Sequence, residues 1–425
     1  MDSFEIAINV CVSLNRISST LIVEARGPEL AAIMPDAIIL GIESSCDETG
    51  AAVVRSGQEI LSNVVASQIA THQPYGGVVP ELASREHLRA ILPVVRQALA
   101  EARQTYESVD AIAVTQGPGL AGSLLVGISF AKALAFALEK PLIAVNHIEG
   151  HIHAVLLEQR QSGNIELNFP VLALVVSGGH THLYLAGAEQ DLWTYQNIGH
   201  TRDDAAGEAF DKVAKLLGFG YPGGPIIDRL APHGDPNAVK FQTSQIKHRD
   251  RRDHGQSKER RELPPVPRFD FSYSGIKTAV LRYVEKHNLQ PQTEQRRRAL
   301  ADIPNPTVDD YLRLTDKQIL DLTASFQRAM VDDLVEKTLA AAAEYDVRTL
   351  FVSGGVAANQ ELRATFQREA EMQGVPVFFP SRSLSTDNAA MIAAAAFPKF
   401  LARNFVPMDF SAEAGMALGA GVRGT

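Results

Sequence analysis

A strand-and-glycine pattern occurs twice in this sequence of 425 residues and constrains its fold more than any other feature. Apolar runs at 171–176 and 349–352 each lead into Ser-Gly-Gly, at 177–179 and 353–355. Paired glycines after a strand let backbone N–H groups come close to an anion, as phosphate-binding loops require. Two ordinary tight turns would also explain the pattern. The repetition favours two related phosphate- or nucleotide-facing loops in a duplicated fold.

Strands and helices alternate along the chain, as they do in proteins built around parallel sheets. Residues 109–115 and 141–145 have the composition of short apolar strands, and an Ala- and Leu-rich helix is expected at about 122–138 between them. This spacing implies parallel pairing with a right-handed crossover. Three further strands are expected earlier in the chain, at 37–43, 50–55 and 59–67. A β-β-β-α-β-α start is typical of a ribonuclease-H-like layer.

Composition limits the classes of protein to consider. The apolar fraction of 45% and the charged fraction of 21% are ordinary for a globular chain. The net charge of −9 argues against a wholly basic nucleic-acid coat, although a local basic face remains open. Cys11 and Cys46 are too few for a disulfide framework or a cysteine-rich zinc site, so a reducing cytosol is expected.

One uncharged stretch, 111–131, is long enough to cross a bilayer. Gln-Gly-Pro-Gly at 116–119 interrupts it in the middle. We therefore expect a strand, a tight loop and a helix there, and no membrane span.

Two segments depart from the globular pattern. Residues 1–33 lack the basic start and apolar run of a signal peptide, and we interpret them as an upstream-start artefact or a loose tail. The stretch 247–261 has seven basic and three acidic residues, so 245–268 is interpreted as a polar surface insertion or, alternatively, as an RNA-contacting patch. The arginine triplet at 296–298 leaves the same two alternatives open.

Two histidines have the spacing of metal ligands. His147 and His151 would lie above one another on a helix, which is good geometry for one metal ion, whereas surface or helix-capping histidines are the alternative. Asp387 could supply a third ligand or could cap the Ala-rich helix expected at 389–396. Two histidines and one aspartate leave coordination positions open for a substrate. Glu149 lies two residues after His147, not directly after it as in His-Glu-x-x-His, so zinc-peptidase chemistry is disfavoured.

Acidic residues gather at two further places. Glu43, Asp47 and Glu48 lie within six residues directly after a strand. They would be costly in a compact turn unless they are solvated or face a cation or a polar ligand. Asp211 flanks the apolar stripe of an expected helix and could simply pair with Lys215.

Ten short motifs occur in the order found in one known family. They are GIESSCDET at 41–49, YGGVVPELASR at 75–85, QGPG at 116–119, HIEGH at 147–151, VSGGHTH at 176–182, DDAAGEAFD at 203–211, YPGGP at 221–225, FSYSGIK at 271–277, VSGGVAAN at 352–359 and STDN at 385–388. With them the sequence resembles the bacterial TsaD-type tRNA N6-adenosine threonylcarbamoyltransferases over about residues 37–420. The departures, an N-terminal tail and the polar insertion, interrupt no motif.

The resemblance implies a fold and a reaction. The expected fold is α/β and two-lobed, of the actin-like, Hsp70-like and sugar-kinase-like kind, with duplicated ribonuclease-H-like domains and the active site in the cleft. An extension is expected at 1–36, a first lobe at 37–145 completed by C-terminal helices at 386–425, and a second lobe at 146–385. Family members transfer threonylcarbamoyl from threonylcarbamoyl-AMP to N6 of adenosine-37 in tRNAs that read codons beginning with adenine, and release AMP.

The resemblance also assigns roles to residues of this sequence. His147, His151 and Asp387 would hold one divalent ion, Fe²⁺ or, as a substitute, Zn²⁺. Asp47 and Glu48 would lie near it, and either could relay the amine proton as a catalytic group. The residues that would bind the adenylate are Val175, Val176, Ser177, Gly178, Gly179, Asp211, Gly224, Asp228 and Asn359.

Partners and alternatives follow from the same resemblance. The expected partners are tRNA, threonylcarbamoyl-AMP received from a TsaC-type enzyme, a TsaB-like pseudo-paralogue and a TsaE-like ATPase, in the cytoplasm. The acidic balance gives no clear tRNA-binding face, so a partner is expected to supply part of that surface. An ATP-dependent small-molecule kinase, a metalloprotease and an Hsp70-like scaffold are the competing functions. Neither a kinase nor a scaffold needs a paired-histidine site.

Overall fold

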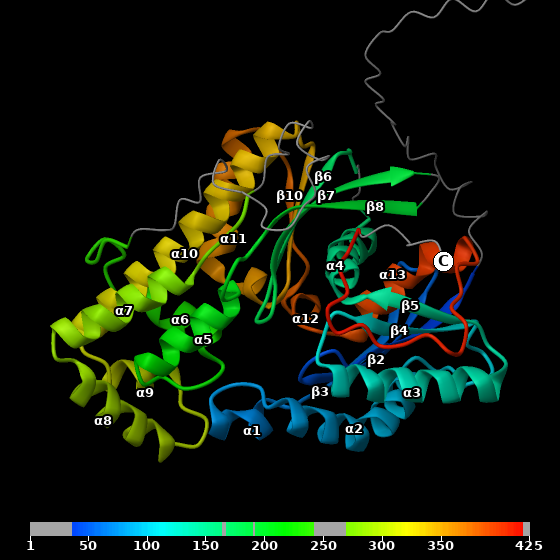
Figure 1. Cartoon of the computed structure of the whole chain (residues 1–425), viewed down its shortest axis with the longest axis horizontal. Helices are drawn as coiled ribbons and strands as arrows, with labels where there is room; N and C mark the ends of the chain where they lie inside the picture. The colour runs from blue at the N-terminus through cyan, green and yellow to red at the C-terminus, as the bar shows by residue number, and fades with distance from the viewer. Residues whose placement is uncertain (1–35, 164–166, 190–191, 242–268, 420–425) are drawn as a thin grey trace, which may run out of the picture.

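Two five-stranded mixed sheets form the framework of the protein (Figure 1). The computed structural model describes residues 36–163, 167–189, 192–241 and 269–419. The extension expected at 1–36, except for Asp36, and the insertion at 245–268 lie outside these residues.

The first sheet has the strand order β3-β2-β1-β4-β5. The strands are β1 (Ile38–Glu43), β2 (Glu48–Arg55), β3 (Glu59–Ser67), β4 (Ala111–Gly117) and β5 (Leu142–Asn146). The pairings β1–β2 and β2–β3 are antiparallel, whereas β1–β4 and β4–β5 are parallel. All five strands lie within two residues of their predicted bounds.

The second sheet repeats the first strand for strand. Its order is β10-β9-β6-β7-β8, with antiparallel pairing of β6–β7 and β7–β8 and parallel pairing of β6–β9 and β9–β10. The strands are β6 (Val171–Val176), β7 (Thr181–Glu189), β8 (Leu192–His200), β9 (Thr349–Ser353) and β10 (Val377–Phe378). The predicted duplication of a ribonuclease-H-like layer is confirmed by this shared topology.

Successive residues of a strand point to opposite faces of the sheet. Both faces of the first sheet carry apolar residues, and helices cover both. Leu40 of β1 packs toward α2 (Pro80–Glu101) and α3 (Ala121–Leu138). Ile39 packs toward α13 (Ala389–Leu401), whose alanines allow a close approach. Gly41 is required there, since a Cβ would lie 2.4 Å from the Ala389 carbonyl oxygen. The expected boundaries of the two lobes stay a prediction.

Helix α4 (His147–Gln161) lies between the two sheets (Figure 1). Its Ala154 and Leu157 pack in the core cluster of the first sheet. Its Ile148 and Ile152 pack with Val175 and neighbouring residues of the second sheet. A side chain near the start of α4 therefore stands where the two sheets meet.

The other face of the second sheet carries the largest of the core clusters, which joins β6 and β9 to several helices. The remaining helices are α1 (Ile69–His72), α5 (Ala206–Leu216), α6 (Gly223–Leu230), α7 (Ser274–Lys286), α8 (Gln290–Ala301), α9 (Val308–Arg313), α10 (Lys317–Glu344), α11 (Gln360–Met372) and α12 (Arg382–Ser385). Short 3₁₀ turns occur at Gln73–Tyr75, Ala231–His233 and Gly355–Ala358.

The uncharged stretch 111–131 forms β4, a loop and the first half of α3, as the sequence predicts. Helix α3 is long and apolar enough to cross a membrane by length and composition, a test that core helices also pass. Its Leu124, Ile128 and Ala131 are buried against the first sheet.

The C-terminal segment, residues 405–419, runs along the first sheet and reaches the second (Figure 1). The backbone N–H of Val406 donates to the carbonyl of Leu142, and that of Glu413 donates to the carbonyl of Gln116. Further on, Leu418 is buried with Ile148 of α4 and with residues of β7. The segment thus contacts both sheets.

Candidate active site

The two histidines of the predicted metal site lie on the first two turns of α4. Asn146 caps this helix, because its Oδ1 accepts hydrogen bonds from the N–H groups of Ile148 and Glu149 at 2.9 and 3.4 Å. His147 and His151 consequently share one face, with their ring centroids 4.7 Å apart. Both side chains are buried, which rules out the alternative of surface histidines.

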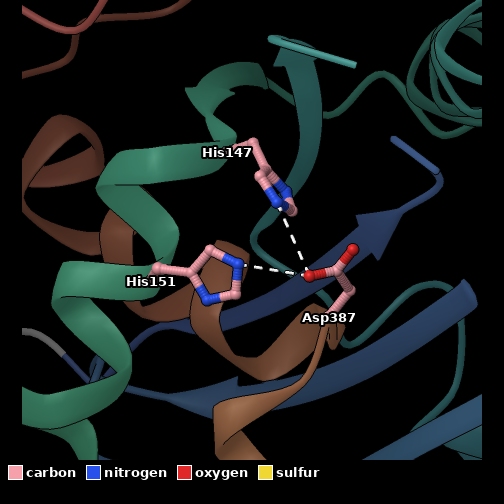
Figure 2. A group of neighbouring side chains, drawn as sticks. All are labelled: His147, His151 and Asp387. Atoms are coloured by element: carbon pink, nitrogen blue, oxygen red, sulfur yellow. Dashed lines mark ion pairs between the residues drawn. The ribbon is translucent and has the colours of Figure 1, made fainter. Parts of the chain in front are cut away.

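Asp387 lies opposite the two imidazoles, in the loop between α12 and α13 (Figure 2). Its Oδ1 is 3.1 Å from Nε2 of His151 and 3.6 Å from Nε2 of His147. The alternative role of Asp387 as the cap of α13 is wrong, because Asn388 accepts the N–H of Met391 and caps that helix. The structure therefore brings together the three predicted ligands, one atom from each lying within 4.8 Å of the others.

The chemistry of this His–His–Asp cluster fits a cation. Both ring nitrogens of His151 are buried, and within the described residues neither makes a hydrogen bond, although Nε2 lies close to Asp387. A buried polar atom without a hydrogen bond is costly unless another group binds it. Two imidazole nitrogens and a carboxylate oxygen are ligands that zinc and ferrous iron accept. The cluster is thus a candidate metal site.

Without a cation, the electrostatics of the cluster favour a protonated His147 between two carboxylates. Burial would raise the pKa of Asp387, but the charge of His147 and the contact with His151 hold that pKa well below its usual value. Burial lowers the pKa of His151. Burial also acts to lower the pKa of His147, yet the charges of Asp387 and Glu43 raise it to about 9. An ionised carboxylate thus faces the imidazoles.

Glu149 cannot act as the general base of a peptidase here. Its Oε2 forms an ion pair of 2.7 Å with Nζ of Lys399, which also donates to the carbonyl of Ala144. The pair ties α4 to α13, the helix that follows Asp387. The ion pair therefore holds together two helices that adjoin the candidate metal site.

Replacing Lys399 by methionine is expected to leave Glu149 as an unpaired, mostly buried charge. Removal of one partner of such a pair should lower the free energy of unfolding by about 2–4 kcal/mol. The double variant Glu149→Leu/Lys399→Met should recover most of that loss. Urea denaturation of the three proteins measures both values, and equal stability of the single variant and the wild type would contradict the assignment.

The acidic turn between β1 and β2 is not a solvated turn. Glu43 is fully buried, and Asp47 and Glu48 are partly buried. Ser67 donates to Oε1 of Glu48 at 2.9 Å, and Tyr221 reaches Oδ2 of Asp47 at 3.5 Å. Burial raises the pKa of Asp47 and raises that of Glu48 to about 8, with the charge of Asp387 adding to both shifts. Both carboxyls lie close enough to the cluster to sense its charge.

The Glu48→Gln variant should be more stable than the wild type at alkaline pH. A carboxyl whose pKa rises from 4.5 to about 8 on folding adds stability at low pH and loses it as the pH rises between these values. Glutamine has no charge to bury, so its advantage should grow by at most about 3 kcal/mol between pH 5.5 and 8.5. Thermal unfolding at both pH values tests this, and an advantage that is independent of pH would contradict it.

The two Ser-Gly-Gly loops lie side by side at the carboxyl ends of two neighbouring strands of the second sheet. β6 and β9 are parallel neighbours, so both loops follow carboxyl ends of strands. Gly354 has a φ of 92° and packs on the carbonyl oxygen of Val176, which lies 2.4 Å from the place of a Cβ. At Gly178 and Gly179 an added Cβ would meet no described atom within 4 Å. Open space next to paired glycines suits a phosphate group.

This glycine loop adjoins the His–His–Asp cluster. His180, the residue after Gly179, has its ring centroid 5.9 Å from that of His147. Burial lowers the pKa of His180 to about 3, with the charge of His147 adding to the effect, so its imidazole is neutral. The glycine loop and the candidate metal site are therefore neighbours.

Two other predicted adenylate ligands, Asp211 and Asp228, accept hydrogen bonds from backbone N–H groups. Oδ1 of Asp211 accepts the N–H of Gly223 at 2.7 Å, and burial raises the pKa of Asp211 to about 6. Its expected alternative partner, Lys215, instead donates to the carbonyl of Tyr75 at 3.3 Å. Asp228 accepts the N–H of Gln360 at 3.1 Å.

Three of the predicted adenylate ligands are buried. Val175 and Val176 are fully buried within β6. The side chain of Asn359 caps α11 and also donates to Gln327. By contrast, a Cβ on Gly224 would meet only one described atom within 4 Å, at 3.9 Å, so its surroundings are open. Val175 and Val176 are buried along with their main-chain atoms, between β7 and β9, so the structure does not expose them to a ligand.

Sequence reasoning missed the contact between Glu43 and His147. Oε2 of Glu43 is 3.1 Å from Nδ1 of His147. A usable signal existed, because Glu43 ends β1 and His147 directly follows β5 in the same partly parallel sheet. Residues that follow parallel strands meet at one edge.

The fold and the site together define a class of protein. A duplicated, two-lobed α/β fold of the actin-like kind places a candidate metal cluster beside a glycine-lined, phosphate-facing loop. Residues 59–394 match the family model described as TsaD, tRNA N6-adenosine threonylcarbamoyltransferase. The chain belongs to this family of acyltransferases.

Individual relatives agree with this placement. A tRNA N6-adenosine threonylcarbamoyltransferase of Koribacter versatilis is 68% identical over 385 residues, which cover 91% of this chain and 100% of the relative. One of Syntrophobacter fumaroxidans is 50% identical over 377 residues, covering 88% and 98%. The crystal structure of full-length HypF in the phosphate- and nucleotide-bound form has a TM-score of 0.50 at 13% identity, covering 86% of this chain and 46% of HypF. That likeness concerns the fold.

Proposed function

We propose that this protein transfers the threonylcarbamoyl group from threonylcarbamoyl-AMP to N6 of adenosine-37 in tRNA and releases AMP. Membership of a family whose members carry that name supports the reaction. The observation that carries the proposal for the site is the 5.9 Å approach of His180, at the end of the glycine loop, to His147 of the cluster. It allows one adenylate to have its phosphate at the loop and its carbamoyl group at the cluster.

The binding residues follow from the positions described above. Backbone N–H groups of Ser177, Gly178 and Gly179 would hold the phosphate. Asp211 and Asp228 would accept ribose hydroxyls. His147, His151 and Asp387 would hold the divalent ion, for which we propose Fe²⁺, with Zn²⁺ as a substitute. Such an ion supplies Lewis-acid polarisation of a carbonyl oxygen and a fixed point for orientation.

The chemistry requires an activated donor and a proton acceptor. The exocyclic amine of adenine is a weak nucleophile, whereas AMP is a good leaving group from a carbamoyl-phosphate anhydride. The N6–C bond forms, the bond from the carbamoyl carbon to the phosphate oxygen breaks, and one amine proton must leave. Asp47 is the acceptor that we propose, since Glu48, with a pKa of about 8, is mostly protonated near neutral pH.

The relatives' name also supports tRNA as the acceptor. We propose in addition a cytoplasmic location, a TsaB-like pseudo-paralogue and a TsaE-like ATPase as partners. A kinase would not need the paired imidazoles, and Glu149 is held by Lys399 and is not free for peptidase chemistry. No observation favours these alternatives over the acyl transfer.

A reconstitution assay tests the proposed function. The purified protein is combined with its partner proteins, a TsaC-type enzyme, threonine, bicarbonate, ATP and unmodified tRNA. Nuclease digestion and mass spectrometry then measure the threonylcarbamoyl nucleoside. A tRNA with guanosine at position 37 serves as the control substrate and should remain unmodified. Absence of the modified nucleoside while the TsaC-type enzyme forms threonylcarbamoyl-AMP would contradict the proposal. Steady ATP turnover by this protein alone, without the partner proteins, would favour a kinase.

A further inference from the structure

Glu43 lies directly behind the cation site and is fully buried. It ends β1, and its Oε2 is 3.1 Å from Nδ1 of His147, on the side of the ring away from Asp387. Nε2 of the same ring faces Asp387, as Figure 2 shows. The imidazole of His147 thus lies between two carboxylates, each next to a different ring nitrogen.

Both carboxylate oxygens of Glu43 already accept hydrogen bonds. Oε1 accepts the N–H of Ser45 at 2.5 Å, and Oε2 accepts the hydroxyl of Thr115 at 2.7 Å. These donors come from the loop after β1 and from the neighbouring strand β4, so parts of the first sheet fix the carboxylate in place. Oγ of Ser45 lies 3.1 Å from the same Nδ1.

The hydrogen bonds of Glu43 indicate which ring nitrogen of His147 carries a proton. An ionised carboxylate only accepts hydrogen bonds, so Nδ1 must donate to Oε2 of Glu43. In a neutral imidazole the lone pair is then on Nε2, the nitrogen that faces Asp387 and His151. This is the form in which a histidine can bind a cation at that position.

We propose that Glu43 is a positioning residue of the metal centre, which fixes the tautomer and ring orientation of His147 so that Nε2 faces the cation. Carboxylates that accept the second N–H of a ligating histidine have this effect in metal sites generally, and their loss typically weakens metal binding by about 10–100-fold. His151 differs, because its Nδ1 has no hydrogen-bond partner among the described residues. Glu43 is therefore the protein group that orients one of the two imidazoles.

Charge balance gives a second reason for the buried carboxylate. Asp387 and Glu43 are the acidic groups within 4 Å of the ring nitrogens of His147 and His151 in the described structure. With neutral imidazoles, their two negative charges balance one divalent cation. A buried site with balanced charge avoids the high cost of an uncompensated ion.

The Glu43→Gln variant tests the proposal because glutamine keeps the shape but cannot accept at both ends. If its oxygen faces Ser45, its amide donates toward His147 and favours a proton on Nε2, which blocks the cation. If its oxygen faces His147, the amide opposes the N–H of Ser45. Ser44→Ala is the matched control, since this buried neighbour donates to the carbonyl of Ser123 and not to the imidazole.

Zn²⁺ affinity, measured by competition with a chromogenic chelator, is the first readout. We expect Glu43→Gln to bind Zn²⁺ about 10–100-fold more weakly than the wild type, and Ser44→Ala to bind it within about twofold of the wild type. Unchanged affinity in Glu43→Gln would overturn the proposal.

A second measurement decides the question if Glu43→Gln does not fold. Nitrogen-15 NMR of histidine-labelled, Zn²⁺-loaded wild type should show His147 ligated through Nε2 with a proton on Nδ1. Ligation through Nδ1 would overturn the proposal. The inference rests on the metal centre of the proposed function and not on group transfer. A wild type that binds no Zn²⁺ would overturn both, whereas normal Zn²⁺ binding without tRNA modification would contradict only the function.

Discussion

Alanine at position 151 is expected to abolish metal binding and threonylcarbamoyl transfer together. His151 is fully buried, and its Nε2 faces Oδ1 of Asp387 at 3.1 Å, where a cation bound by both groups would lie. Removal of a ligand should weaken metal binding by more than the roughly 10–100-fold that the loss of an outer partner costs. Metal content after dialysis and the yield of modified nucleoside measure the two effects.

His153→Ala is the matched control, because it removes a buried imidazole from the same helix. Nε2 of His153 lies 3.1 Å from the hydroxyl of Tyr195, and its ring packs near Trp193. This variant should lose stability but keep its metal. Full transfer activity in His151→Ala, or equal metal loss in both variants, would contradict the assignment of the cluster.

A leucine at position 178 is expected to weaken nucleotide binding while the protein stays folded. A Cβ at Gly178 would meet no described atom within 4 Å, so the folded chain has room for the side chain. That room is the space we assign to the phosphate, and the leucine would exclude it. Affinity for AMP should fall by at least about tenfold, equivalent to about 1.4 kcal/mol, as measured by calorimetry.

Gly415→Leu provides the comparison for this experiment. Gly415 also has open space around its Cβ position among the described residues, but it lies in the C-terminal segment. Both variants should have thermal stabilities near that of the wild type, and only Gly178→Leu should lose affinity for AMP. Wild-type affinity in Gly178→Leu would mean that the phosphate binds elsewhere.

The framework could be predicted from the sequence because its signals are local. Apolar runs such as 171–176 and 349–352 have strand length, and each ends in the glycines that stop a strand. The spacing of His147 and His151 likewise needs only a helix to bring the rings together. Such patterns involve residues that are only a few positions apart, so they can be recognised in a single sequence.

Contacts between residues far apart in the chain could not be predicted from the sequence. Asp387 had two plausible roles, and only the conformation of the loop shows that Asn388 caps the helix. Asp211 and Lys215 have the spacing of an ion pair, yet each has another partner across a tertiary contact. The register of neighbouring strands, which places Glu43 behind His147, is a property of the assembled sheet.

Besides α4, the C-terminal segment also links the two sheets. Leu418 packs against α4 and β7, and the N–H of Glu413 donates to the carbonyl of Gln116, near the end of β4. A change in the relative position of the two sheets would have to alter these contacts as well as those of α4. An affinity tag fused at the carboxyl end would follow the segment that makes these contacts. Kinetic work is therefore better done with a tag at the amino end.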